Sequence, residues 1–214
     1  MKKRFRIFVE GDADNKFMGD YYYHLFREKA PKGSIIHTGE LENSNKGGKD
    51  KLTAEVNIRE MQINFDQGGT NLVIFDADKD IDARRKELMA IKEQYGVDFE
   101  LFLLPNNEDV GELEDMLEKI INPNNRPILT CWEKYEQELV KLDIPGRTPP
   151  PLTTPAKKTK IYGYLEALLG ESKSQKEKIK EANRNYENTL HWCLDVEYLE
   201  PLQKFLIINL DIKH

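Results

Sequence analysis

Acidic residues that directly follow apolar segments are the feature of this sequence best suited to chemistry. Glu10 ends the segment RFRIFVE, and a D-x-D pair, Asp76 and Asp78, begins at the last residue of NLVIFD. A carboxylate at the end of a buried strand is costly unless it is paired or bound to a metal. Carboxylates gathered at one edge suit Mg²⁺ or Mn²⁺, and two such ions can clamp the attacking and leaving oxygens of a phosphodiester. The sequence therefore predicts a divalent-metal site.

Two further acids are candidates for the same site. Asp14 lies one turn after the first apolar segment, and Glu114 lies in a helix expected at residues 111–121. At about 100° per residue, Glu114 falls on the border of the apolar stripe of that helix, whereas Asp115 and Glu118 lie further towards solvent. We therefore expect Glu114 to lean inward.

Helix capping is the simpler interpretation for several acids. Helix N-termini favour acids because their N–H groups are free and their dipole is positive. Asp80, Asp82 and Glu112 are expected to act as caps, and for Asp14 both interpretations stay open. Glu10 and Asp76 end strands instead, so capping does not explain them.

The elements that must position these acids alternate along the first 120 residues. Strands are expected at 4–10, 34–38, 71–76 and 99–104, and the helices between and after them at 14–29, 50–65, 81–95 and 111–121. Four strand–helix repeats predict an α/β fold with a Rossmann-like, doubly wound, mostly parallel sheet. Such sheets have their sites at the carboxyl ends of the strands. That rule selects Glu10, Asp76 and the loop 105–109 as one region.

A helical extension follows at residues 122–214. Helices are expected at 126–142, 158–183 and 198–210, and the proline-rich segment 143–156 is expected to be an extended loop. The apolar residues of the extension need a surface to cover, so it is expected to pack back onto residues 1–121.

The charge is unevenly distributed over the chain. The net charge of −6 alone disfavours nucleic acid. Residues 76–118, however, hold 14 acids against 5 bases, a local −9, and residues 147–185 hold 9 bases against 4 acids, a local +5. With metal in the acidic part, the protein can present a positive track to DNA or RNA, so binding is expected to depend on the metal.

Composition also limits where the protein works. No apolar run approaches the roughly 20 residues of a membrane-spanning helix. The two cysteines, Cys131 and Cys193, are too few for a disulfide framework. We expect a cytoplasmic protein with no membrane partner.

Glycines offer a further phosphate contact. Gly11 follows the first strand, and K-G-G-K-D at 46–50 could bring backbone close to a phosphate, with Lys46 or Lys49 supplying charge. The spacing is not that of a P-loop, and a solvated loop is the alternative interpretation.

At this point the motifs V-E-G-D-A-D, I-F-D-A-D and G-E-L-E-D-M-L resemble those of Toprim domains. The stretch at 102–117 is similar to that of small stand-alone bacterial Toprim-like proteins related to the overcoming-lysogenization-defect (OLD) nucleases, and the W-x-x-D at 192–195 looks like their ending. The resemblance is strongest over residues 5–121. It implies a Toprim fold and a Mg²⁺-dependent nuclease.

The resemblance also implies roles for individual residues. It makes Glu10, Asp76 and Asp78 the metal and acid/base residues, with Asp14 and Glu114 as further metal ligands. The OLD group adds a lysine beyond the Toprim unit. Three lysines are candidates and spacing does not separate them; we assign the catalytic role to Lys160 and phosphate contact to Lys157 and Lys158.

Two other functions remain open. The chain could be a binding module that holds metal or nucleic acid and recruits a protein partner without catalysis. Phosphatase chemistry of the haloacid dehalogenase type is a weaker alternative, because its nucleophilic Asp usually follows the first strand, which here ends in Glu10.

Overall fold

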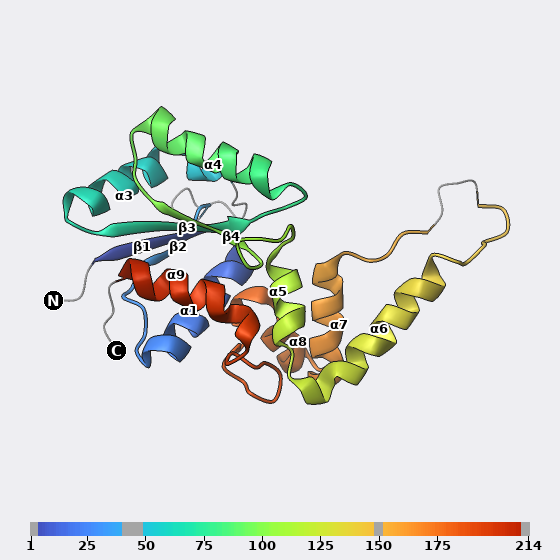
Figure 1. Cartoon of the computed structure of the whole chain (residues 1–214). Helices are drawn as coiled ribbons and strands as arrows, with labels where there is room; N and C mark the ends of the chain where they lie inside the picture. The colour runs from blue at the N-terminus through green and yellow to red at the C-terminus, as the bar shows by residue number, and fades with distance from the viewer. Residues whose placement is uncertain (1–3, 40–48, 148–151, 211–214) are drawn as a thin grey trace.

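The fold is built around one four-stranded sheet in which all neighbouring strands are parallel. The computed structural model describes residues 4–39, 49–147 and 152–210. The strand order is β2-β1-β3-β4, and helices cover both faces (Figure 1). This arrangement confirms the predicted doubly wound α/β fold with helices after it.

The strands lie where the sequence predicts them; β1, β2 and β4 are shorter than expected, and β3 begins one residue earlier. They are β1 (Phe5–Val9), β2 (Ile35–His37), β3 (Thr70–Asp76) and β4 (Glu100–Leu104). In register, β1 residue 9 pairs with residues 37 and 74, and β3 residue 76 with residue 104. All four carboxyl ends therefore reach the same edge of the sheet.

Alternate strand residues face two different cores. On one face the strands pack against α1 (Asp12–Phe26), α5 (Leu113–Ile120), α7 (Lys157–Leu169) and α9 (Glu200–Leu210). On the other they pack against α2 (Lys49–Leu52), α3 (Glu55–Asp66) and α4 (Ile81–Tyr95), and Figure 1 shows α3 and α4 on the side opposite α1 and α9. Burial on both faces is why the β1 and β3 sequences are nearly all apolar.

The residues after the sheet share its first core. Ile161, Tyr164, Trp192 and Leu206 are buried in the same cluster as β1 and β3. The expected helix at 158–183 is divided into α7, α8 (Lys173–Ile179) and a short 3₁₀ turn at Glu181–Asn183. The division follows from Gly170, which ends α7 at φ 90°, and from Ser172, whose hydroxyl caps α8.

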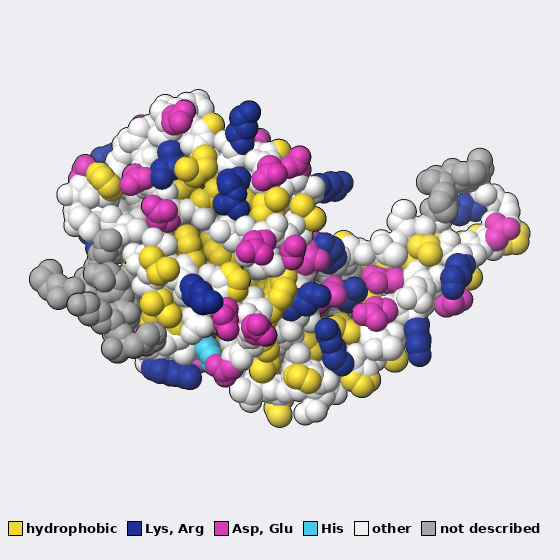
Figure 2. All heavy atoms as spheres, in the orientation of Figure 1, with side chains coloured by type: hydrophobic (Ala, Val, Ile, Leu, Met, Phe, Trp, Pro, Cys, Tyr) yellow, Lys and Arg dark blue, Asp and Glu magenta, His cyan; other side chains and the backbone are white. Residues whose placement is uncertain are grey.

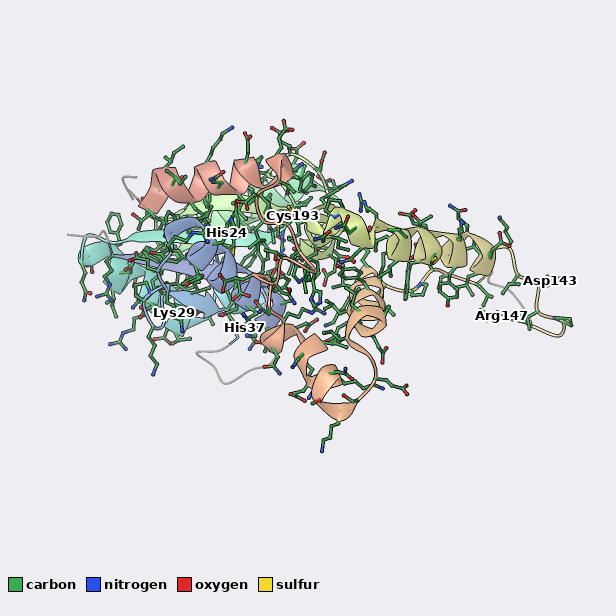
Figure 3. The ribbon with its side chains drawn as sticks, turned by 90° about the horizontal axis from the view of Figure 1, so that it is seen from below. His24, Lys29, His37, Asp143, Arg147 and Cys193 are labelled. Atoms are coloured by element: carbon green, nitrogen blue, oxygen red, sulfur yellow. The ribbon has the colours of Figure 1, made fainter. Side chains whose placement is uncertain are left out.

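Helix α6 (Arg126–Leu139) extends away from the body as an arm (Figure 1). Leu129, near its base, is its one buried residue among those described. Asp143 and Arg147 lie at the far end of the arm (Figure 3), and its surface carries charges of both signs (Figure 2). The described part of the proline-rich segment forms no helix or strand.

Three short 3₁₀ turns connect the elements of the extension, at Pro123–Asn125, Glu181–Asn183 and Glu197–Leu199. The helix expected at 50–65 is interrupted, because Ala54 takes an extended conformation between α2 and α3. Across the described ranges, none of the helices combines the length and apolar character needed to span a membrane.

Candidate metal centre

Four acids from four different elements meet at the carboxyl edge of the sheet. Glu10 follows β1, Asp14 lies in the first turn of α1, Asp76 ends β3, and Glu114 lies in the first turn of α5. The backbone N–H of Asp76 donates to Glu10 Oε1 at 3.2 Å. Asp76 is repelled electrostatically by each of the other three. The sequence prediction that these acids share one region therefore agrees with their placement.

Asp14 is a helix cap with one oxygen left over. Its Oδ2 accepts from the backbone N–H of Gly11 at 3.0 Å, which is the capping role. Its Oδ1 is buried and has no hydrogen-bond partner. Burial, with repulsion from Glu10 and Glu114, raises the pKa of Asp14 from 3.8 to about 7. The capping interpretation of Asp14 is therefore observed for Oδ2, and Oδ1 is left free for the metal-ligand role that stays a prediction.

Glu114 reaches the site because a backbone bridge holds the start of α5 against the end of β3. Asp78 and Gly111 exchange two N–H···O=C bonds of 2.9 Å, and Leu113 N–H donates to Asp76 Oδ1 at 2.9 Å. Gly111 has φ 143°, and a Cβ there would collide with Oδ2 of Asp115. Only glycine fits this approach of the two chains.

The expected inward lean of Glu114 is observed. It is 9% exposed, while Asp115 caps its own helix by accepting from the N–H of Glu112 at 2.8 Å. Burial raises the pKa of Glu114, and the positive charge of Arg184 opposes the rise. The carboxyl of Glu114 is thus placed in the interior next to Asp14 and Asp76.

Arg84 of α4 is the cation that touches this cluster directly. It forms ion pairs with Glu10 (2.5 Å), Glu87 (3.2 Å) and Asp78 (3.5 Å). Burial raises the pKa of Glu10 although Arg84 opposes the rise. Asp78 itself is exposed and has φ 57°, a left-handed conformation that Asp tolerates better than most residues. Asp78 therefore lies at the rim, not in the interior.

The cluster has the ligands for a divalent cation but is not closed around one. Within the described ranges, no three acidic, histidine or cysteine side chains are already placed to hold an ion. The reason is visible in the bonds: Glu10 is held by Arg84, and Asp76 Oδ1 accepts from Leu113. The unpartnered Asp14 Oδ1 and the mutual repulsion of the acids nevertheless fit a hard cation.

Among the three lysines of α7, Lys158 is the one whose pKa is affected by an acid of the cluster, Glu114. Its Nζ pairs with Glu181 at 2.5 Å, and this bond, with a smaller contribution from Glu114, raises the pKa of Lys158. Lys157 pairs with Asp115 at 2.7 Å, on the exposed side of α5. Both lie beside the start of α5, as phosphate contacts at this edge require.

Lys160 is placed elsewhere. Its Nζ lies 3.0 Å from Glu118 and 3.5 Å from Glu136, so it ties α7 to the last turn of α5 and to the arm. The structure thus does not bring the lysine we assigned to catalysis to the acids. On helix α7, Lys158 and Lys160 are about 200° apart, so only one of them can face the cluster.

Other candidates stay outside the cluster. Asp80 caps α4 by accepting from Ala83 N–H at 3.0 Å, as its capping interpretation predicts. In the loop 105–109, Asp109 bonds to Asn106 at 2.8 Å and is exposed. The expectations for Lys46 and for the side chain of Lys49 fall outside the described residues. Gly11 lies at the site, with its N–H bonded to Asp14.

Two arginines and a tyrosine were missed by sequence reasoning. Arg84 lies near the N-terminus of α4, where the helix dipole disfavours cations. An arginine at this unfavourable position could have been recognised from sequence as a candidate partner for an acid. Arg184 and Tyr186 are buried and interact electrostatically with Glu114. They lie in a polar stretch with no helical or strand period, so no pattern marked them as interior.

The comparisons with known proteins match the chain over nearly its whole length to one family. A family model described as "Protein of unknown function (DUF3226)" matches residues 4–206. No curated protein and no solved structure matches the chain.

Proposed function

We propose that this chain, which belongs to the family described as protein of unknown function (DUF3226), is a Mg²⁺-dependent phosphodiesterase that cleaves DNA or RNA. The observation that carries the proposal is the convergence of Glu10, Asp14, Asp76 and Glu114 at the sheet edge, where burial raises the pKa of all four and repulsion within the cluster adds to the rise for Asp14 and Asp76. Metal-binding and catalytic sites are where such shifts gather. The resemblance to Toprim motifs over the same residues supports the same chemistry.

The chain's own residues have separable roles in this proposal. Glu10, Asp14, Asp76 and Glu114 would hold the metal, with Asp78 at the rim. Bound Mg²⁺ supplies Lewis acidity and positive charge to a phosphodiester. Because the pKa of Asp14 is raised to about 7, its carboxyl would be partly protonated at neutral pH without a cation and would lose that proton on binding one.

The basic residues around the acids suit the substrate. Arg84 is planar and forked, so after release from Glu10 it can donate two bonds to one phosphate. Lys158, on α7, can provide a point charge after release from Glu181. These two take the role that the sequence analysis gave to Lys160.

Cleavage of plasmid, linear and single-stranded substrates with Mg²⁺ or Mn²⁺ tests the proposal. We expect wild type to cut and Asp76→Asn to lose at least about 100-fold in rate, because a metal ligand is removed. Asp80→Asn is the matched control: it belongs to the same acidic run, is exposed, and keeps a capping side chain. Wild-type activity no higher than that of Asp76→Asn would refute the proposal.

A non-catalytic binding module is the second candidate. The observation in its favour is that the three lysines of α7 all form ion pairs with acids. Among the described residues, no cation of α7 is therefore free to stabilise a transition state. Titration calorimetry with Mg²⁺, combined with the cleavage assay, separates the nuclease from the binding module. Binding of metal and of nucleic acid without cleavage would support the binding module.

A further inference from the structure

Beside Arg184, among the helices of the extension, lies a polar pocket. It has a volume of about 340 Å³ and lies between α7, α8 and the segment 183–192. Its polar lining consists of Lys178, Asn183, Arg184, Asn185, Asn188 and His191. No Asp or Glu is among the described residues that line it. The charged residues that line the pocket are thus positive, whereas those of the candidate metal centre are mostly negative.

Arg184 is a buried cation that forms no ion pair with a described carboxylate, although its charge acts on Glu114. It is 1% exposed, its Nε donates to the carbonyl of Ile179 at 3.0 Å, its Nη1 donates to the hydroxyl of Tyr186 at 3.5 Å, and its guanidinium lies 4.8 Å from the ring centre of Tyr162. Its Nη2 is buried and makes no hydrogen bond. Arg84, by contrast, is paired with three carboxylates. A buried guanidinium left in this state is costly, so an anion beside it would stabilise the fold.

Lys178 shows the same pattern at the exposed end of the pocket. Its neighbours on α8 and after it, Lys176 and Lys180, pair with Glu166 at 3.5 Å and Glu177 at 2.7 Å. Lys178 makes no ion pair with any described residue. Two cations without carboxylate partners therefore border one pocket.

The charge and size of the pocket indicate the ligand. Two positive charges match a phosphomonoester, which carries close to two negative charges at neutral pH. Arg and Lys together suit phosphate, with the fork of Arg on two oxygens and Lys as a point charge. The volume exceeds that of a bare phosphate and lies in the range of small-molecule sites. Leu165, Leu169 and Trp192 add an apolar wall for an organic group.

We propose that the pocket bordered by Arg184 and Lys178 binds a small phosphomonoester, of the class of a mononucleotide. The site is separate from the metal centre and does not depend on the proposed nuclease activity. The phosphate would bind Lys178 at the exposed end of the pocket and lie near the buried charge of Arg184, which would attract it electrostatically. The organic group would lie against Leu165 and Trp192.

Thermal unfolding and calorimetry of the full chain in EDTA test this site, because without metal the acidic centre repels anions. The probes are inorganic phosphate, AMP and adenosine. We expect AMP at about 10 mM to raise the Tm by about 2 °C or more and adenosine to leave it unchanged. Equal affinities for phosphate and AMP would support the site with the free ion as ligand; tighter AMP binding would support the phosphomonoester.

Variants connect the effect to this pocket. Lys178→Gln should weaken AMP binding about threefold to tenfold, and Arg184→Gln should abolish it. Because Arg184→Gln removes a buried side chain, Asn185→Asp is a second test: it adds a negative charge at the lining and should also weaken AMP. Lys176→Gln is the control on the same helix. Absent AMP binding, equal protection by adenosine, or unchanged binding in both Lys178→Gln and Asn185→Asp would overturn the proposal.

Discussion

Replacing Asp14 with Asn should stabilise the metal-free protein at neutral pH. Asp14 is buried, its Oδ1 has no partner, and its pKa rises from 3.8 in the unfolded chain to about 7. Between these values the folded state binds more protons than the unfolded state, so the free energy of unfolding falls as pH rises from about 4 to 7. Below pH 4 this penalty is absent, and above pH 7 it is complete.

The size of the effect follows from the pKa. The rise in the pKa of Asp14 from 3.8 to about 7 corresponds to about 4 kcal/mol of lost stability above pH 7. Asn keeps an acceptor for the Gly11 N–H and removes a buried charge that Glu10 and Glu114 repel. For a chain of this size, recovery of even half of that energy raises the Tm by about 4–8 °C.

Thermal unfolding of wild type and Asp14→Asn in EDTA at pH 5 and pH 8 is the assay. The variant should gain much more at pH 8 than at pH 5. Mg²⁺ should then raise the Tm of wild type more than that of the variant, because the variant lacks a ligand. Asp80→Asn, which keeps its cap, should follow wild type throughout. A variant less stable than wild type at pH 8 in EDTA would refute the reasoning.

Three further predictions follow from single contacts. Arg84→Gln should cost about 1–3 kcal/mol in EDTA, since it leaves Glu10 without its ion pair, and Mg²⁺ should restore much of the loss in thermal unfolding; an equal loss with and without Mg²⁺ would contradict this. Gly111→Ala should lower stability by about 2–4 kcal/mol, from backbone strain at φ 143° and collision with Asp115, as measured by urea unfolding; a neutral change would contradict the close approach. Leu142→Glu, on the arm, should change the free energy of unfolding by less than about 0.5 kcal/mol in the same assay, because its side chain is exposed; a larger loss would mean that the arm packs on something.

The parts of the site that could be predicted from sequence are those set by local periodicity. Glu10 and Asp76 could be located because each follows an apolar run that the two-sided sheet requires. The inward position of Glu114 follows from its angle on the helix, and its burial confirms that prediction. Asp80 could likewise be recognised as a cap from its place before α4.

The partners of these acids could not be predicted, because tertiary placement decides them. Arg84 lies 74 residues from Glu10 along the chain. Which of the three lysines lies near the acids could not be predicted for a related reason. Their angles around α7 are known from sequence, but the rotation of α7 relative to α5 depends on core residues such as Ile161 and Tyr164. Local spacing therefore identifies the acids and leaves their counter-charges undetermined.

The balance of charge at the centre constrains how metal and nucleic acid can bind together. The five carboxylates of the proposed site, Asp78 included, carry with Arg84 a net charge of −4 when all are ionised. One divalent ion leaves −2, which still repels a phosphate backbone, whereas a second ion brings the sum to zero and removes that repulsion. Nucleic-acid affinity should therefore rise with occupancy of the second metal position, not the first. Loss of this repulsion would allow a chain with net charge −6 to bind a polyanion at its most acidic edge.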